Sequence, residues 1–341
     1  MEKTKTIITG GAGFIGSHLA ERLLSAGHNL VLVDNFSTGQ RHNIDHLIGD
    51  RCRVVESTAA EALSDIDLLE GVSRIYHLAA AVGVKLVVDD PAAMIRNNID
   101  ETDVVLRAAA RAGASVLITS SSEVYGKCPV LPLQEDMELV YGPTTASRWS
   151  YGLSKAIDEH LAIDLARRIG LRSVVVRLFN TIGPRQVGRY GMVVPRFVSQ
   201  AVAGKNLTLY GDGKQTRAFC DVRDVVDALA KLLDHDDAYG RVFNVGSTKQ
   251  ITIEQLADQV IELVAEAGGP RVEKSFVSYE AVYGEGFEDP PHRLPDMSRL
   301  HEAIGFSPKV RLQQTLSELI DAEQARTILA EPSGHSEEEK G

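Results

Sequence analysis

The sequence predicts an α/β protein in which helices cover both faces of a doubly wound parallel sheet, followed by a smaller α/β lobe. Two observations carry this prediction. Short β-branched runs alternate with helical stretches through the first half of the chain, a pattern typical of parallel sheets. At 341 residues, the chain is also too long for one ordinary core, so two lobes are expected.

The predicted elements follow one another in a regular order. Strands are expected at residues 5–9, 30–34, 53–56, 74–80, 115–120 and 173–180. Amphipathic helices are expected at 17–27, 93–112 and 151–169, the first ended by Gly27. Beyond residue 180, glycines and prolines interrupt the pattern, which indicates a second lobe.

Composition excludes several classes of protein. The chain is 44% hydrophobic and 24% charged, as in soluble globular proteins. It has no apolar run of the ~18 residues that a membrane span needs and no signal-peptide pattern. A net charge of -11 argues against nucleic acid as a partner. The three cysteines, Cys52, Cys128 and Cys220, lack metal-ligand spacing, so we expect reduced thiols, no metal site and a cytoplasmic location.

The segment "ITGGAGFIGSHLAERL" predicts a dinucleotide site of the Rossmann type. Gly10, Gly13 and Gly16 follow the first strand and open the first helix, where small residues let the backbone approach a pyrophosphate. Asp34 ends the second strand, where a carboxylate hydrogen-bonds the adenine ribose and repels a 2'-phosphate. The pattern therefore favours NAD over NADP, and Asn35 is expected to line the same pocket.

The segment "YGLSK" predicts an acid–base pair. Tyr151 and Lys155 are four residues apart, on one face of a helix. A tyrosine has a free pKa of about 10, but a nearby ammonium and an oxidised nicotinamide both favour its phenolate. The pair is then suited to remove a hydroxyl proton while NAD takes the hydride from the same carbon. Ser121, in the serine-rich end of the strand at 115–120, is placed to hydrogen-bond the same oxygen.

These motifs together resemble a known family. Besides those above, the chain contains "HLAA", "SSSEVYG", "RLFNTIGPRQ", "YGDGKQTRAFCDVRDVV", "FNVGS" and "HRLPDMSRL". Over about residues 4–325 it is similar to extended short-chain dehydrogenases/reductases of the nucleotide-sugar epimerase, dehydratase and decarboxylase group. The resemblance implies a NAD-binding domain at 1–180, to which 222–245 returns, and a nucleotide-sugar lobe at 181–330. The tail 331–341 has little to bury and is expected to be disordered.

The resemblance also implies roles for individual residues. Catalysis is assigned to Ser121, Tyr151 and Lys155. Glu123 is added to them from its place two residues after Ser121, a structural role at the strand end being its alternative. NAD binding is assigned to Gly10, Gly13, Phe14, Ile15, Gly16, Asp34, Asn35, Ala79, Ala80, Tyr151 and Lys155. Substrate binding is assigned to Ser122, Asn180, Thr181, Arg185, Arg189, Val194, Arg217 and Arg293. Guanidinium groups suit this role because their planar fork binds phosphate oxygens bidentately. Val194 belongs to a stretch, 193–197, that fits either the wall of the base pocket or an ordinary core.

Three reactions in this group begin with oxidation at C4 of the sugar. A 4,6-dehydratase uses an Asp-Glu pair where this chain has Ser122-Glu123, so dehydration is not expected. The "SEVYG" segment is typical of UDP-glucuronate decarboxylases, whereas the "VGVK" loop after "HLAA" favours 4-epimerases. Glu123 is expected beside the C5–C6 side of the sugar, where it would have to be protonated or bridged to face a substrate carboxylate.

The favoured prediction is a NAD-dependent UDP-sugar 4-epimerase acting on UDP-glucuronate or UDP-glucose, and the alternative is UDP-glucuronate decarboxylase. A non-catalytic NAD-binding regulator is the hypothesis from another class. As an epimerase, the enzyme would clamp the uronate carboxylate with Ser121, Ser122 and Thr181, yielding UDP-galacturonate with little CO₂. The two long helical stretches, 93–112 and 151–169, and the resemblance together predict a homodimer built by a helix bundle.

Overall fold

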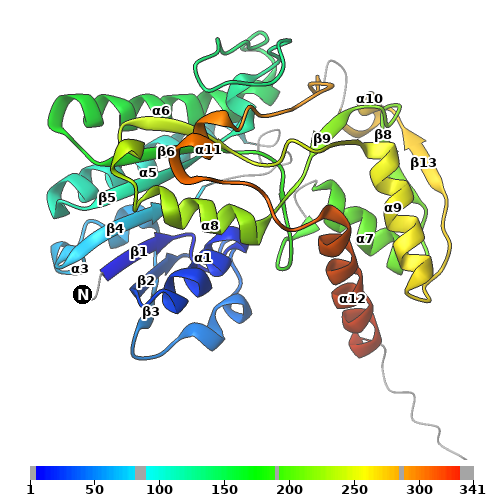
Figure 1. The fold of residues 1–341 in the computed structure, drawn as a ribbon, viewed down its shortest axis with the longest axis horizontal. Helices are drawn as coiled ribbons and strands as arrows, with labels where there is room; N and C mark the ends of the chain where they lie inside the picture. Colours follow the sequence, from blue (N-terminus) through cyan, green and yellow to red (C-terminus); the bar gives the residue numbers. More distant parts are fainter. Residues whose placement is uncertain (1–4, 81–89, 189–191, 284–287, 331–341) are drawn as a thin grey trace, which may run out of the picture.

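The first lobe is built on one parallel sheet. The computed structural model describes residues 5–80, 90–188, 192–283 and 288–330. Within them a seven-stranded sheet has the order β11-β6-β5-β4-β1-β2-β3, and every pairing in it is parallel (Figure 1). Its strands are β1 (Lys5–Thr9), β2 (Asn29–Asp34), β3 (Cys52–Glu56), β4 (Val72–His77), β5 (Ser115–Ser121), β6 (Ser173–Leu178) and β11 (Arg241–Val245). The predicted doubly wound α/β fold is confirmed.

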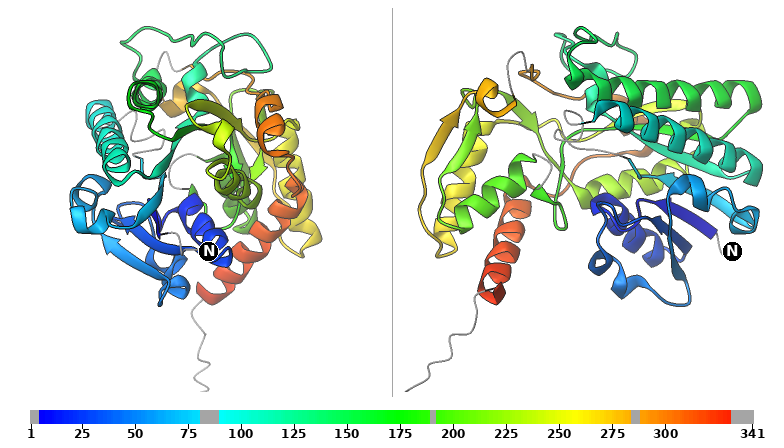
Figure 2. Two further views of the ribbon diagram at one scale, coloured as in Figure 1. Left: turned by 60° about the vertical axis from the view of Figure 1, so that its left-hand side comes forward. Right: turned by 180° about the vertical axis from the view of Figure 1, so that it is seen from behind.

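Helices cover both faces of this sheet. Against one face pack α1 (Phe14–Ser25), α8 (Val222–Leu232) and α11 (Ser298–Ile304). Against the other pack α2 (Ala59–Ala62), α3 (Ile66–Leu69), α5 (Pro91–Ala112) and α6 (Ser150–Ile169). Figure 2 shows α5 and α6 side by side, on the side of the molecule away from α8.

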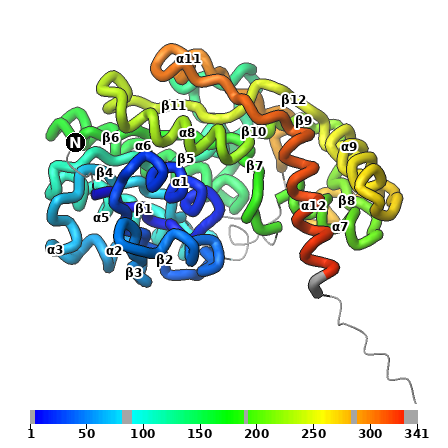
Figure 3. The backbone as a smooth tube through the Cα atoms, turned by 60° about the horizontal axis from the view of Figure 1, so that its bottom comes forward, coloured from blue at the N-terminus to red at the C-terminus, as the bar shows by residue number. Residues whose placement is uncertain are grey.

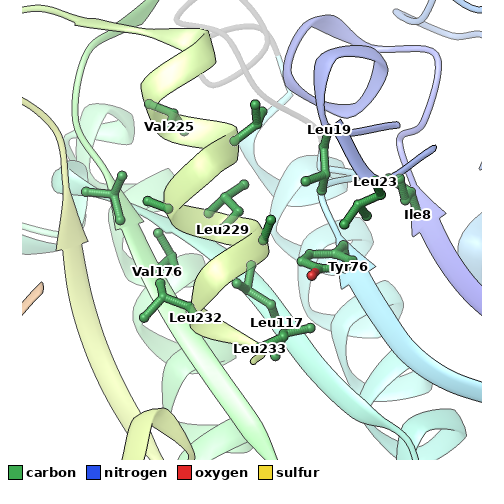
Figure 4. Packing of buried hydrophobic residues seen from close by; sticks show 14 of the residues in the cluster. Ile8, Leu19, Leu23, Tyr76, Leu117, Val176, Val225, Leu229, Leu232 and Leu233 are labelled. Carbon is green, nitrogen blue, oxygen red and sulfur yellow. The ribbon is translucent and has the colours of Figure 1, made fainter. Parts of the chain in front are cut away.

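The core beneath α8 joins segments that are far apart in the sequence. Leu229 and Leu232 of α8 lie over Leu117 of β5 and Val176 of β6, and all four are fully buried (Figure 4). Each such side chain contributes about 1.5–3 kcal/mol through burial. Because β11 then pairs with β6, the segment 222–245 lies against the first sheet. On the basis of these contacts, we propose that residues 222–245 belong to the same domain as residues 1–180.

Local signals explain where the two long helices begin and end. The Asp90 carboxylate caps α5 by accepting a hydrogen bond from the backbone N–H of Ala93, and Pro91 occupies the first turn. Gly113 ends α5 and Gly170 ends α6, with φ of 62° and 69°. This left-handed backbone favours glycine, so both helices stop there.

The second lobe has a separate core. It gathers α7 (Val193–Val202), α9 (Ile253–Glu266) and α12 (Leu312–Ala330) around buried residues that include Val194 and Phe197 (Figure 3). Three two-stranded sheets accompany these helices in the described part of the chain. They pair β8 (Leu207–Tyr210) with β13 (Lys274–Val277), β9 (Thr216–Ala218) with β12 (Gln250–Thr252), and β7 (Thr181–Ile182) with β10 (Cys220–Asp221). The short helix α10 (Tyr279–Tyr283) follows β13. Among the described helices, none combines the length and the apolar character of a membrane span.

Candidate active site

The predicted cofactor and catalytic residues lie at one edge of the sheet. Gly10 follows β1, Asp34 ends β2, Ala79 and Ala80 follow β4, and Ser121 ends β5. Since these strands are parallel, their carboxyl ends meet at the same edge. Open parallel sheets bind their ligands in the crevice outside this edge.

The glycine loop between β1 and α1 has no room for side chains. A Cβ at Gly16 would lie 2.1 Å from the carbonyl oxygen of Gly10, and one at Gly10 would lie 2.8 Å from the Ala79 nitrogen. Gly10 also has a φ of 68°. The first turn of α1 contains no acidic residue, so the positive end of the helix dipole is unopposed there. This cradle fits the pyrophosphate of a dinucleotide.

Asp34 is oriented by backbone donors. Its Oδ2 accepts a hydrogen bond from the Ala12 N–H at 2.9 Å, and its Oδ1 accepts one from the Phe36 N–H at 2.8 Å. Burial raises the pKa of Asp34, while these two hydrogen bonds oppose the rise. The carboxylate is thereby fixed where the sequence places an adenine ribose. Asn35 is exposed, and its Oδ1 accepts a hydrogen bond from the Ser37 N–H.

Phe14 and Ile15 begin α1 directly after the loop. Both are partly buried and pack against the core under α1 and α8. Their side chains therefore anchor the start of the helix, and their backbone belongs to the loop that would hold the pyrophosphate.

Tyr151 and Lys155 lie on α6, next to the end of β5. The Ser121 hydroxyl acts on the Tyr151 hydroxyl and lowers the pKa of the phenol. Burial has the larger effect and raises this pKa above its usual range, and the charges of Glu123 and Asp158 raise it further. Tyr151 is therefore a neutral phenol that needs a nearby cation before it can act as a base.

Gly152 allows α6 to approach the turn that carries Glu123. This turn, Ser122–Tyr125, follows β5 directly. A Cβ at position 152 would lie 2.5 Å from the carbonyl oxygen of Glu123. The Ser121 Oγ also accepts a hydrogen bond from the Glu123 N–H at 3.2 Å. The catalytic helix and the Glu123 turn are thus held in direct contact.

Glu123 is bridged by two arginines. Arg148 pairs with both of its carboxylate oxygens, and Arg293 Nη1 lies 2.5 Å from its Oε1. Burial alone would raise the pKa of Glu123, but the charges of Arg293 and Arg148 outweigh it and lower the pKa to about 2. Glu123 is therefore held as an ionised, arginine-paired carboxylate at neutral pH.

A second carboxylate completes this cluster. Asp289 Oδ2 lies 2.5 Å from Arg217 Nη2, and its Oδ1 lies 3.6 Å from Arg148 Nη2 and from Arg293 Nη2. Three guanidinium groups thus surround two carboxylates, a net charge of about +1. Such a cluster can bind an anionic group of a nucleotide sugar.

Sequence reasoning missed Arg148 and Asp289. Arg148 lies three residues before Tyr151, in the turn that leads into α6, and Asp289 lies four residues before Arg293. These short spacings are visible in the sequence and could have indicated that Arg148 and Asp289 lie near the predicted site residues. The convergence of both residues on Glu123 and Arg217 depends on the tertiary fold.

The other predicted substrate residues are dispersed. Arg185 lies against α1, where it donates to Ser17 at 3.1 Å and pairs with Glu21, away from the arginine cluster. The Thr181 hydroxyl donates to the Phe179 carbonyl at 3.1 Å. Val194 is part of the core of the second lobe. Ser122 is buried and Asn180 half-buried. Arg189, and the "VGVK" loop that favoured epimerisation, lie outside the described residues.

Fold and site together define a dinucleotide-dependent enzyme with the tyrosine–lysine pair of short-chain dehydrogenases/reductases. The chain belongs to the NAD dependent epimerase/dehydratase family, whose model matches residues 6–246. The predicted family and the predicted cofactor, NAD, are confirmed.

Relatives by sequence include decarboxylases of nucleotide sugars. The chain is 38% identical over 319 residues to UDP-N-acetyl-alpha-D-glucosaminuronate decarboxylase of Bacillus cytotoxicus, covering 93% of this chain and 97% of the relative. It is 37% identical to UDP-glucuronic acid decarboxylase 3 of Arabidopsis thaliana, covering 92% and 86%.

Similar solved structures include 4-epimerases. UDP-N-acetylglucosamine 4-epimerase of Methanobrevibacter ruminantium is 28% identical, with a TM-score of 0.85 and coverage of 96% of this chain and 100% of that one. UDP-glucuronic acid 4-epimerase of Bacillus cereus, solved with NAD, is 28% identical, with a TM-score of 0.80 and coverage of 95% and 99%. The chain is therefore an enzyme that modifies nucleotide sugars, which sets aside a purely regulatory role.

Proposed function

We propose that the enzyme is a UDP-uronate decarboxylase, acting on UDP-glucuronate or its 2-acetamido analogue. The observation that carries the proposal is the ionised Glu123, held between Arg148 and Arg293 two residues after Ser121. The names of relatives 34–38% identical to the chain support it, since each is called a UDP-uronate decarboxylase.

In this proposal Ser121 and Tyr151 bind the oxygen on C4 of the sugar. Tyr151 removes the proton of the C4 hydroxyl, and the Lys155 ammonium stabilises the resulting phenolate. When bound, NAD supplies the hydride acceptor and donor that this chemistry needs. Asn180 and Arg217 are proposed to hold the nucleotide part of the substrate.

The oxidised sugar is a β-keto acid, which loses CO₂ readily. The C5–C6 bond breaks, its electron pair is delocalised onto the C4 oxygen, and C5 then takes up a proton from water. As C4 is reduced again, Tyr151 returns a proton to its oxygen. The products are CO₂ and a UDP-linked pentose.

Glu123 favours this outcome through its charge. A substrate carboxylate beside a fixed carboxylate is repelled, and Arg148 and Arg293 are already paired with Glu123 and lie near Asp289. As CO₂ forms, negative charge leaves this position and moves to the C4 oxygen, where Ser121 and Tyr151 donate hydrogen bonds. An interaction accelerates a reaction only if it is more favourable in the transition state than in the ground state. The repulsion between Glu123 and the substrate carboxylate meets this condition, because it is relieved as CO₂ forms.

The second candidate is 4-epimerisation, which the similar solved 4-epimerases favour. An epimerase must keep the carboxylate by holding it near the ring plane. Thr181 was expected to take part in this clamp, but its hydroxyl proton is directed to the Phe179 carbonyl. Ser121 and Ser122 are the candidates that are left.

The experiment that separates the two uses UDP-glucuronate and its 2-acetamido analogue. Each is incubated with the NAD-loaded enzyme, CO₂ is trapped, and the sugar products are resolved by NMR. Decarboxylation gives a UDP-pentose and one CO₂ per turnover. UDP-galacturonate without CO₂ would reject the proposal in favour of epimerisation.

Replacing Glu123 with glutamine should lower CO₂ release about 10²-fold, a typical size for the loss of one electrostatic contribution to a transition state. Oxidation at C4 should persist, because Tyr151 and Lys155 are unchanged, and is followed as NADH absorbance in a single turnover. Glu288→Gln is the matched control, since it makes the same charge change in an exposed pair with Lys127. Equal losses of oxidation and CO₂ release in Glu123→Gln would contradict the assigned role.

We also propose that the enzyme is a homodimer formed through α5 and α6. Leu153 and Ile157 of α6 are 36% and 43% exposed, and a second copy would cover them. Light scattering at micromolar concentration should give about twice the chain mass of 37.0 kDa. A particle of 37.0 kDa would contradict the dimer.

A further inference from the structure

The catalytic helix carries a third charged side chain on the face of Tyr151 and Lys155. Asp158 lies three residues after Lys155 and seven after Tyr151, so the three side chains share one face of α6. Lys155 Nζ donates to Asp158 Oδ2 at 3.0 Å. Their side chains are 3% and 0% exposed, which makes this a fully buried ion pair.

Packing does not explain Asp158. Its Oδ1 accepts no hydrogen bond of normal geometry among the residues that the structure describes. Burial raises the pKa of Asp158, and the Lys155 ammonium, followed by the Thr102 hydroxyl, opposes the rise. A buried carboxylate with one oxygen unpaired is costly, and an apolar side chain would fill the same place without that cost. A buried, incompletely paired charge next to a catalytic lysine points to a role in the reaction.

The charges around Tyr151 come from few elements. Glu123, from the turn after β5, is balanced by Arg148, from the turn before α6, and by Arg293. Arg177 of β6 is paired with Glu159. Glu123 and Asp158 are the negative charges that raise the pKa of Tyr151, and of these two only Asp158 is paired with Lys155.

The groups that face Asp158 and Lys155 from the sheet and from α5 are neutral. His77 ends β4, where its ring nitrogens lie 2.8 Å from Thr9 Oγ1 and 3.3 Å from Thr102 Oγ1. Burial, followed by the charge of Lys155, lowers the pKa of His77 to about 3, so it is uncharged at neutral pH. Thr102, on α5, does not titrate.

We propose that Asp158 is a positioning residue that balances the charge of Lys155 and thereby sets the pH at which Tyr151 acts as a base. The proposal rests on the proposed function only in taking Tyr151 as that base. Lys155 stabilises the phenolate, and the carboxylate of Asp158 offsets part of this effect. The enzyme therefore works at a higher pH than the tyrosine–lysine pair alone would allow.

The direction of the effect follows from charge. Burial raises the pKa of Tyr151 most, and the negative charges of Glu123 and Asp158 raise it further. In Asp158→Asn the amide oxygen still accepts a hydrogen bond from Lys155, but the negative charge is gone. The phenol should then lose its proton at lower pH.

The test compares Asp158→Asn with wild type, both loaded with NAD. We expect the acid limb of kcat/KM for UDP-glucuronate to move to lower pH by about one unit, the size that a neighbouring charge produces. The KM on the plateau should change less than about twofold, since Asp158 touches Lys155 and not the substrate. Asp158→Glu, which keeps the charge, should leave the limb where it is in wild type.

A spectroscopic titration gives the same answer without turnover. Ionisation of Tyr151 is followed by ultraviolet difference absorbance, each protein being compared with its own Tyr151→Phe variant. If wild type turns over no UDP-uronate, the proposed function fails, while this titration still decides the role of Asp158. Asp158→Ala takes the place of Asp158→Asn if the latter does not fold.

Asp164→Asn is the matched control, because it makes the same charge change on α6 in an exposed pair with Arg168. It should leave both the limb and the titration unmoved. The proposal is overturned if the acid limb of the kcat/KM profile of Asp158→Asn lies at the same pH as in wild type or at a higher pH. A rate lowered by the same factor at every pH would show that Asp158 is structural.

Discussion

Replacing Tyr151 with phenylalanine should lower turnover by about 10²–10⁴-fold, the range that general acid–base catalysis contributes. The hydroxyl is the group that exchanges a proton with the C4 oxygen, and the aromatic ring that fills the site is unchanged. Binding of UDP should stay within about twofold of wild type, because Arg217 and Arg293 are untouched. Steady-state rates with UDP-glucuronate and calorimetric titration with UDP measure the two quantities separately.

Tyr141→Phe is a suitable control for the tyrosine change. The Tyr141 hydroxyl donates to the Val124 carbonyl at 2.7 Å and takes no part in the proposed chemistry. Retention of more than about a tenth of the activity in Tyr151→Phe would show that another group is the base. A loss of UDP binding comparable to the loss of rate would instead indicate damage to the fold.

Replacing Glu159 with alanine should cost about 3–5 kcal/mol of unfolding free energy, because it leaves the buried charge of Arg177 without its partner. Arg177 Nε and Nη2 donate to the two oxygens of Glu159 at 2.9 and 2.7 Å, and the side chains are 5% and 6% exposed. Ser120 Oγ donates to the same carboxylate at 2.5 Å. Urea unfolding at a fixed, saturating NAD concentration measures the change.

Two further variants show whether the loss of unfolding free energy comes from the buried ion pair. Asp164→Ala removes an exposed pair from the same helix and should cost less than about 1 kcal/mol. A double variant, Glu159→Leu with Arg177→Met, should recover much of the stability, since apolar side chains can replace a buried ion pair. If Glu159→Ala costs no more than Asp164→Ala, the buried pair is not a source of stability.

The parts of the site that sequence predicts best are local. The glycine loop, Asp34 and the Tyr151–Lys155 pair each depend on spacing within one turn or one helix, and such spacing is visible in a single sequence. The first helix shows the limit of periodicity: it was expected from residue 17 and begins at Phe14, because the glycine loop leads into it directly. Pro91 and the cap from Asp90 likewise start α5 before the residue that periodicity suggested.

The arginine cluster shows what sequence could not predict. Glu123, Arg148, Arg217, Asp289 and Arg293 come from four separate segments and meet only after both lobes have folded. The ionised state of Glu123 depends on that meeting. Sequence motifs alone favoured epimerisation, partly through a loop outside the described residues. The bridged Glu123 is the physical reason for proposing decarboxylation instead.

The position of β11 at the edge of the first sheet has a consequence for synthesis on the ribosome. When residue 180 has been made, every other strand of that sheet exists, but β11 and the helix α8 that covers the face above β5 and β6 do not. The apolar face of the sheet above β5 and β6 therefore stays uncovered in the nascent chain while residues 181–221 are translated. The first sheet can be completed only after Val245 has left the exit tunnel, when α9, β13 and α12 of the second lobe are still to be made.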